Sequence, residues 1–580
     1  MPSSNILEER LGRLLQQIYP DQDQGLLTAQ VIAAFWPDPK KPLQEPQQSG
    51  NAQWSQKDSL LITYGDSVID GKSRPLQLLH SFLHDRLSDV VNGVHILPFF
   101  PYTSDDGFAV SDYYKVNSEL GSWDDISAIA KDFQLMSDLV LNHVSSQSAW
   151  FSAYLQDEPP YDEYFIEASP DEDLTATVRP RTSPLLQAVE TPGGTRHVWC
   201  TFSHDQIDLN FKSHKLLLEI IRIIRLHVDQ GVRIIRLDAV AFLWKEPGTS
   251  SVHLPQTHAV VKLLRVLADF AQEQIVLLTE TNVPKAENLS YFGQGDEAHM
   301  IYNFPLPPLI LHALLAGTAT YLNRWQAAMP PAPMGCSYLN FSASHDGIGM
   351  RPAEGLLPAA EVAQMITTIT EQGGKISMRK LPDGSETVYE LNCTYFDALA
   401  QPFEGGEEHH IERFLTSQTV VMSLEGIPAF YIHALLATPN DQQGVLERDM
   451  PRAINRHSWD YTALQQKLID AASNQSTVLD ALSTRIRLRS EQPAFHPNAT
   501  QFTLRVDDRV FGIWRQSLDR TQSIFALHNM SCDEIVIELS TLNLIADEQW
   551  LDLLAGETID ELQESLVFAP YQCRWITNRV

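Results

Sequence analysis

The sequence predicts an α/β protein built around a (β/α)₈ TIM barrel, with inserted subdomains and a C-terminal antiparallel β domain. Three observations predict this architecture: eight short apolar runs, helical patterns between them, and a change to short alternating strands near the C-terminus. Continuous apolar runs are typical of parallel strands that are buried on both faces. A chain of 580 residues is long enough for a barrel and a further domain.

The elements follow one another in the order that a barrel requires. An N-terminal helix is expected within an extension, residues 1–58, that packs on the barrel. Helical periodicity recurs between the apolar runs, most clearly in HKLLLEIIRIIRLHVD and HAVVKLLRVLADFAQ. Eight alternations of strand and helix predict a closed barrel. The predicted strands lie at 60–68, 93–100, 135–143, 232–240, 275–282, 299–304, 338–346 and 428–436.

Two intervals interrupt this alternation and divide the chain. Residues 145–212 are rich in Pro, Asp, Thr and Gly, and residues 347–412 contain GG, PDG and EGGEE turns, so each predicts an inserted subdomain. Short alternating segments such as RVFGIWRQ and SIFALHNM predict antiparallel strands in a C-terminal β domain, residues 496–580. The barrel then consists of residues 59–144, 213–346 and 413–495.

The composition argues against several classes of partner. Lys and Arg number 42 and Asp and Glu number 73, a net charge of −31, which repels nucleic acids and anionic membranes. The segment MPSSNILEERLGRLL lacks the pattern of a secretory signal, and no apolar run reaches 18 residues, so no membrane span is expected. Five scattered cysteines without a CxxC pair favour a reduced, cytoplasmic location.

The candidate functional residues are the polar side chains at the ends of the predicted strands. In a barrel of this kind, reacting groups lie at the carboxyl ends of the strands. Each such residue alone could be a strand-end cap or a core histidine, but together, on four strands, they predict a site on one rim. They are Asp138, Asn142 and His143, then Arg236 and Asp238, then Glu280, then His345 and Asp346.

These residues carry a family resemblance. DLVLNH, GVRIIRLDAV, LLTETN and SASHDG resemble the four signature regions of the α-amylase superfamily, glycoside hydrolase family 13, and the similarity extends from about residue 60 to 460. Within it, the segments RPR, NCTYFDAL, EGIPAFYIH and RAINRH resemble the sucrose phosphorylase branch. That branch contains phosphorylases of sucrose, sucrose 6′-phosphate, glucosylglycerol and glucosylglycerate.

The resemblance implies a retaining mechanism with Asp238 as nucleophile, Glu280 as acid/base and Asp346 as stabiliser. A retaining glycosidase needs a nucleophilic carboxylate and a carboxylic acid on either side of the reacting carbon. Arg236, two residues before Asp238 on the same face of a strand, is predicted to keep that carboxylate ionised and oriented. The resemblance also implies sugar-hydroxyl ligands, which are Asp105, His143, His345 and Arg456.

The choice between phosphate and water as glucosyl acceptor depends on a cation near the acceptor. Phosphate needs one to enter a pocket lined with carboxylates. Arg181 in VRPRTS and Tyr389 in TVYELN match the phosphate-binding arginine and loop tyrosine of the branch. The alternative is that Arg179 and Arg181 merely solvate a loop.

On the leaving-group side, the sequence departs from the sucrose phosphorylases at four positions. Phe242 replaces a tyrosine, Asn282 follows Thr281 where a histidine is usual, and two further expected contacts fall at Val178 and near Thr387. We therefore expect Phe242 and Asn282 to face an aglycone other than fructose, such as glycerol or glycerate.

No cofactor and no metal are predicted. Asn142 matches a calcium ligand of many amylases, but companion oxygens are not recognisable, and Lys245 and Trp244 either line the acceptor side or, as we favour, pack in the interior. The predicted partners are a small glucoside and inorganic phosphate, with the chain a monomer or homodimer. A hydrolase or transglucosidase of the superfamily is the main alternative, and a member without activity is the third.

Overall fold

The computed structural model describes residues 2–38, 53–181, 183–380, 385–406, 408–542, 544, 549–559 and 565–579. Within these ranges, no helix is both long enough and apolar enough to cross a lipid bilayer.

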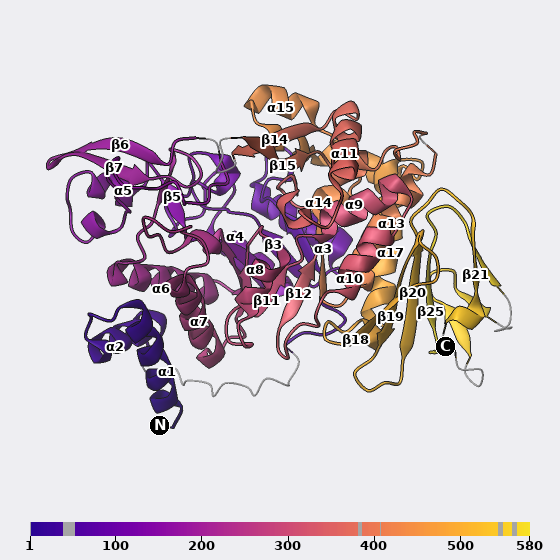
Figure 1. Ribbon diagram of the computed structural model, residues 1–580, viewed down its shortest axis with the longest axis horizontal. Helices are drawn as coiled ribbons and strands as arrows, with labels where there is room; N and C mark the ends of the chain where they lie inside the picture. Colours follow the sequence, from indigo (N-terminus) through magenta and orange to yellow (C-terminus); the bar gives the residue numbers. More distant parts are fainter. Residues whose placement is uncertain are drawn as a thin grey trace.

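A closed barrel of eight parallel strands forms the centre of the molecule (Figure 1). Each strand coincides with one of the eight predicted apolar runs, and each strand ends before the carboxyl end of its run. The prediction of a (β/α)₈ barrel is confirmed. In their order around the barrel the strands are β1 (Leu60–Thr63), β16 (Ile427–Tyr431), β12 (Ser337–Asn340), β11 (Met300–Tyr302), β10 (Val276–Thr279), β9 (Val232–Asp238), β4 (Gln134–Val140) and β3 (Gly93–Ile96).

Helices surround the barrel and bury their apolar faces against it. The predicted segment HKLLLEIIRIIRLHVD forms one helix along its whole length, since its apolar residues recur at helical spacing and are buried. The helix before β4 begins at a capping box in which Ser122 and Asp125 satisfy each other's backbone N–H groups. The main surrounding helices are α3 (Pro75–Leu87), α4 (Trp123–Asp132), α6 (His214–Asp229), α7 (Pro255–Phe270), α9 (Leu306–Ala316), α10 (Thr320–Ala327), α13 (His410–Ser423) and α17 (Asn474–Ser490).

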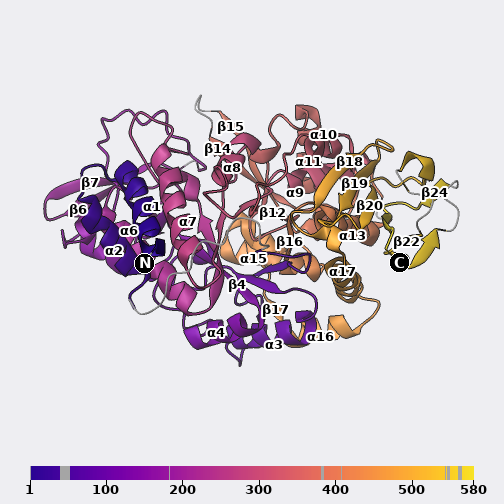
Figure 2. The ribbon, with the colours of Figure 1, turned by 90° about the horizontal axis from the view of Figure 1, so that it is seen from below.

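Two helices of the N-terminal extension pack on the outside of this layer. They are α1 (Pro2–Ile18), which contacts α7, and α2 (Gln24–Phe35), which contacts α6 (Figure 2). Only the first helix was predicted. The Tyr19 hydroxyl donates to the carbonyl oxygen of Phe211 at 2.8 Å, which ties the extension to the barrel. Residues 39–52 of the predicted extension lie outside the described residues.

The two intervals predicted as insertions carry their own small sheets above the carboxyl ends of the barrel strands (Figure 1). The first contains β5 (His143–Ser145), α5 (Ala149–Tyr154), β6 (Leu186–Thr191), β7 (Gly194–Trp199) and β8 (Gln206–Asp208). The second contains β13 (Ile348–Gly349), α11 (Ala359–Glu371), β14 (Lys375–Lys380), β15 (Glu386–Asn392) and α12 (Tyr395–Ala398), and its strands form one sheet in the order β13-β15-β14.

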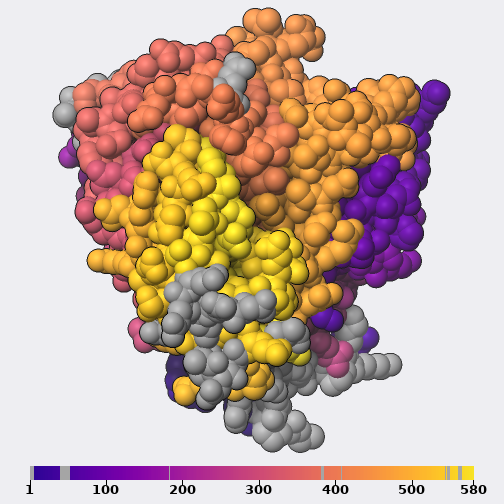
Figure 3. Space-filling view, turned by 90° about the vertical axis from the view of Figure 1, so that its right-hand side faces the viewer, coloured from indigo at the N-terminus to yellow at the C-terminus, as the bar shows by residue number. Residues whose placement is uncertain are grey.

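The C-terminal region is antiparallel, as its alternating pattern predicted. Figure 3 views the molecule from this side, where the yellow C-terminal surface adjoins the orange end of the barrel. A separate apolar cluster around Phe525 and Trp550 fills the space between its two sheets. The larger sheet is β18 (Thr500–Leu504), β19 (Val510–Gln516), β20 (Ser523–Asn529), β25 (Cys573–Thr577), β22 (Trp550–Asp552) and β23 (Glu557–Ile559); the smaller pairs β21 (Ile535–Glu538) with β24 (Ser565–Phe568).

Candidate active site

A cavity opens at the carboxyl ends of the barrel strands. Its floor is formed by residues that follow β9, β10 and β12, and its mouth by residues of the two insertions. Eleven of the residues predicted for the site line this one cavity. They are Asp105, His143, Arg181, Arg236, Asp238, Phe242, Glu280, Asn282, His345, Asp346 and Tyr389.

A buried chain of charges lies under the floor. His95 Nε2 is 2.6 Å from Asp138, the carboxylate of Asp138 also pairs with Arg236, and Arg236 Nη1 donates to Asp238 Oδ1 at 2.7 Å. Burial opposes the ionisation of Asp138, but Arg236 and His95 outweigh it and lower its pKa to about 2. Asp138 is therefore a permanent anion that fixes Arg236 against Asp238.

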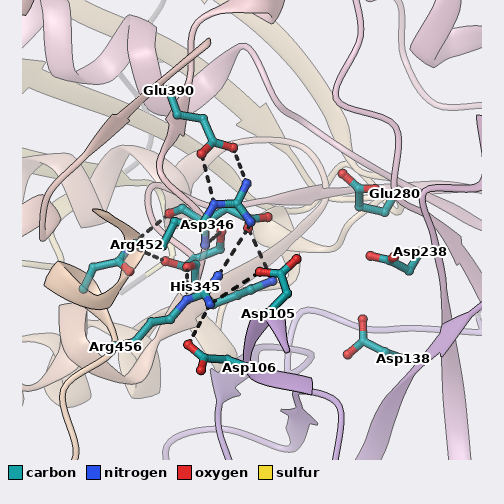
Figure 4. Close-up of polar contacts among 12 residues, drawn as sticks. Asp105, Asp106, Asp138, Asp238, Glu280, His345, Asp346, Glu390, Arg452 and Arg456 are labelled. Carbon is teal, nitrogen blue, oxygen red and sulfur yellow. Dashed lines mark hydrogen bonds and ion pairs between the residues drawn. The ribbon is translucent and has the colours of Figure 1, made fainter. Parts of the chain in front are cut away.

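Asp238 and Glu280 lie beside each other at the ends of the adjacent strands β9 and β10 (Figure 4). Directly after Asp238, Ala239 adopts a left-handed conformation with φ of 50°, and its N–H donates to Glu280 Oε2 at 3.0 Å. Burial raises the pKa of both carboxyl groups, and their mutual repulsion raises that of Asp238 further. Mutual repulsion opposes ionisation of both carboxyl groups at once, and the 2.7 Å contact with Arg236 stabilises the anionic form of Asp238.

Asp346 lies in a different electrostatic environment, beside two arginines. Arg452 Nη1 is 2.7 Å from its carboxylate and Arg456 Nη2 is 3.8 Å away (Figure 4). Although burial opposes ionisation, Arg452 and His345 lower the pKa of Asp346. Arg452 is held in turn by Glu390, which accepts from Nε at 3.1 Å and from Nη2 at 2.6 Å. Asp346 is thus ionised, whereas burial opposes the ionisation of Asp238 and Glu280.

The remaining predicted sugar ligands surround the inner end of the cavity. His143 Nε2 lies 3.0 Å from the carbonyl oxygen of Phe108 and 3.2 Å from the Gln206 amide, which also donates to Asp105 at 3.3 Å. His345 stacks on Phe108 with ring centroids 5.0 Å apart. Burial lowers the pKa of both histidines, so each is neutral at physiological pH and can donate or accept one hydrogen bond.

Arg456, predicted as a sugar ligand, is not among the residues that line the cavity, and neither are the strand-end candidates Asp138 and Asn142. Arg456 is buried behind Asp346, donates through Nε to the His345 carbonyl oxygen at 2.9 Å, and pairs through Nη1 with Asp106 at 2.8 Å. These contacts position the loop that carries His345 and Asp346. Its direct contact with sugar stays a prediction.

Four arginines from the two insertions surround the mouth. Arg181 lies over the rings of Phe202 and Tyr389, at 5.7 and 5.4 Å, and forms no ion pair within the described ranges. The others are Arg179 from the same insertion and Arg351 and Arg379 from the second insertion. The mouth is therefore positive, whereas the floor is rich in carboxylates.

Several residues that line the cavity were not predicted from the sequence. Arg452, Glu390 and Gln206 line the cavity but were not singled out, although Arg452 lies four residues before Arg456 in the RAINRH segment. Glu390 follows the predicted Tyr389 in β15, and the packing of β15 against the segment Pro451–Asn455 brings it to Arg452. No sequence signal indicates Gln206. Val178 and Thr387, which we expected on the leaving-group side, are not among the described residues that line the cavity.

Lys245 is buried away from the cavity, in agreement with the packing alternative. Its ammonium contacts Asn142 Oδ1 at 2.6 Å and Asp208 Oδ2 at 2.8 Å. Burial lowers the pKa of Lys245, and Asp208 opposes this shift. A protein cation thus lies directly against the Asn142 oxygen that the resemblance associates with calcium, and it fastens the first insertion to the barrel.

Comparison with known proteins agrees with this geometry. The family "Alpha amylase, catalytic domain" matches residues 87–332. The glucosylglycerate phosphorylase of Allomeiothermus silvanus is 44% identical over 92% of this chain and 93% of its own length. The chain belongs to the sucrose phosphorylase branch of the α-amylase family.

Further members of the branch are similar over most of the chain. The glucosylglycerate phosphorylase of Spirochaeta thermophila is 41% identical over 98% of both chains. The crystal structure of sucrose 6F-phosphate phosphorylase from Thermoanaerobacter thermosaccharolyticum superposes with a TM-score of 0.72 and 26% identity, covering 88% of this chain and 98% of the other. The family and the barrel inferred from the sequence are both confirmed.

Proposed function

We propose that this protein is a retaining phosphorylase that transfers glucose from glucosylglycerate to inorganic phosphate and releases α-D-glucose 1-phosphate. Membership of a branch of glucoside phosphorylases supports the reaction class. The names of its relatives from A. silvanus and S. thermophila support glycerate as the aglycone over fructose or glycerol.

In the first half-reaction, Asp238 attacks the anomeric carbon while Glu280 protonates the glycosidic oxygen. The bond from carbon to the aglycone breaks, and a bond from the same carbon to Asp238 forms, so glycerate leaves with the proton of Glu280. Two observations support these roles: Arg236 donates to Asp238 and stabilises its anionic form, and burial raises the pKa of Glu280.

In the second half-reaction, Glu280 accepts a proton from phosphate as a phosphate oxygen displaces Asp238. Two displacements at one carbon retain its configuration. Arg181 and Tyr389 are the proposed phosphate ligands, since Arg181 is a cation without a carboxylate partner among the described residues and lies over the Tyr389 ring. Burial raises the pKa of Tyr389 to about 12, so its hydroxyl remains a donor.

The observation that carries the proposal is one cavity that holds the Asp238–Glu280 pair at its floor and Arg181 at its mouth. A hydrolase needs the carboxylates but has no use for a cation there, because water is neutral.

The test is the product formed from glucosylglycerate and a phosphate titration. We expect glucose 1-phosphate in excess of free glucose at millimolar phosphate, with the α configuration seen by NMR. Release of free glucose at every phosphate concentration would instead support the hydrolase alternative.

A further inference from the structure

The second insertion brings two arginines, Arg351 and Arg379, to the mouth of the cavity. We propose that Arg351 and Arg379 bind the carboxylate of the aglycone and so make the enzyme select hydroxy-acid acceptors over neutral polyols. This inference rests on the proposed phosphorylase function and assigns these residues a task separate from phosphate binding.

Both arginines belong to one structural unit. Arg351 follows β13 by two residues, and Arg379 lies in β14 opposite Thr387 of β15. The proposed phosphate ligand Arg181 comes instead from the first insertion. The two insertions supply separate cations to one mouth. The cavity can therefore bind phosphate and the carboxylate of the aglycone at different arginines.

The ion pairs of these arginines leave binding capacity unused. Arg379 Nη2 is 2.6 Å from Glu354, and Arg351 Nη2 is 3.6 Å from Glu287. The arginine side chains are 14% and 18% exposed, whereas their glutamate partners are 49% and 42% exposed. Solvent weakens attraction to such glutamates, so they orient the guanidinium groups without neutralising them fully.

The Nε atom of Arg379 is buried and finds no hydrogen-bond partner within the described part of the chain. A buried donor without an acceptor destabilises a protein, and a bound carboxylate would supply the missing acceptor. Arg379 lines the cavity, so an anionic aglycone can reach this group.

A neighbouring acceptor complements the two arginines. Asn282 lines the same cavity, and its Oδ1 is buried without a partner among the described residues. It packs closely against β13, because a Cβ atom placed on Gly349 would lie 2.8 Å from Asn282 Nδ2. The arginines can donate hydrogen bonds to a carboxylate, and Asn282 Oδ1 can accept one from a hydroxyl. A small hydroxy acid carries both groups. A neutral polyol would leave the arginine donors unpaired.

The experiment compares wild type, Arg351→Gln and Arg379→Gln in the synthetic direction, with glucose 1-phosphate as donor and D-glycerate or glycerol as acceptor. We expect kcat/KM for glycerate to fall about 10- to 100-fold, which corresponds to the loss of a hydrogen bond to a charged group. The value for glycerol should change less than about threefold. Lys375→Gln, which removes an exposed charge from the same strand β14, is the matched control and should leave both values unchanged.

A second assay separates the aglycone site from the phosphate site. With α-glucosyl fluoride as donor no aglycone is present, and the KM for phosphate should stay within about twofold of wild type in both variants. Equal losses with glycerate and glycerol, or a raised KM for phosphate with an unchanged acceptor preference, would overturn the inference. Wild-type enzyme that makes only free glucose from α-glucosyl fluoride and phosphate would instead refute the proposed function, before any variant is considered.

Discussion

The floor and the mouth of the cavity differ in how their charged groups are paired. At the floor, barrel residues form a buried network in which Arg236 pairs with both Asp138 and Asp238. At the mouth, Arg181 contacts aromatic rings, and Arg379 pairs with a half-exposed glutamate. The difference fits the proposed function. Bond cleavage needs charged groups held in one position, whereas the binding of phosphate and of an anionic aglycone needs cations that are not already fully paired.

The degree of burial explains why charges are paired at the floor but less fully paired at the mouth. Ions removed from water must be paired, because an unpaired buried charge is very costly. The floor therefore tolerates few changes, while the half-buried arginines of the mouth can be changed with effects on substrate choice alone. Five predictions test this contrast, from the largest expected effect to the smallest.

The largest effect is expected at Asp238. Asp238→Asn should reduce kcat by about 10⁴-fold or more, because it removes the proposed nucleophile. The variant should fold normally, and mass spectrometry should detect a glucosylated protein after reaction with α-glucosyl fluoride in wild type but not in the variant. Turnover within tenfold of wild type would contradict the assignment.

Glu280→Gln should reduce activity less than Asp238→Asn does, and the size of the reduction should depend on the leaving group. With glucosylglycerate, kcat/KM should fall about 10²- to 10⁴-fold, as expected for loss of a general acid. Glucosylation by α-glucosyl fluoride, which needs no proton, should be nearly unaffected. A similar loss with both donors would refute the role of Glu280.

The same pair of proteins yields a pH prediction. Glu280 must be protonated to act, so wild-type activity on glucosylglycerate should fall as the pH rises through its raised pKa. Glucosylation by the fluoride donor in Glu280→Gln should lack this alkaline decline. A decline that persists in the variant would assign it to another group.

The fourth prediction concerns the buried ion pair between Lys245 and Asp208, which lies away from the cavity. Lys245→Met should lower the free energy of unfolding of the barrel by about 3–5 kcal/mol, because Asp208 would remain buried without its cation. Urea denaturation followed by tryptophan fluorescence measures this change. The control Lys215→Met breaks the exposed pair with Glu163 and should have little effect. Equal losses in both variants would contradict the contrast between buried and exposed charges.

The smallest effect is expected at the mouth. Arg181→Ala should raise the KM for phosphate about 10- to 100-fold and shift the products toward free glucose, since hydrogen bonds between charged groups are lost. Its unfolding midpoint should match that of wild type. An unchanged ratio of glucose 1-phosphate to glucose would mean that phosphate binds elsewhere.

Sequence reasoning succeeded where one physical pattern dominates. Eight apolar runs became eight parallel strands, because a strand buried on both faces must be apolar throughout. The residues directly after these runs, such as Asp238 and Glu280, then meet at one rim as a consequence of the topology. The helix α2, with apolar residues on most of its surface, gave no comparable signal.

By itself, the sequence determined the barrel, the family and the positions of the candidate carboxylates, because strand periodicity and local motifs are properties of neighbouring residues. Only the tertiary structure decided that Glu390 supports Arg452, that Lys245 lies away from the cavity, and that Arg379 lines its mouth. These facts depend on how two insertions fold over the barrel. Contacts between segments far apart in the chain are set by packing and burial, which no local pattern encodes.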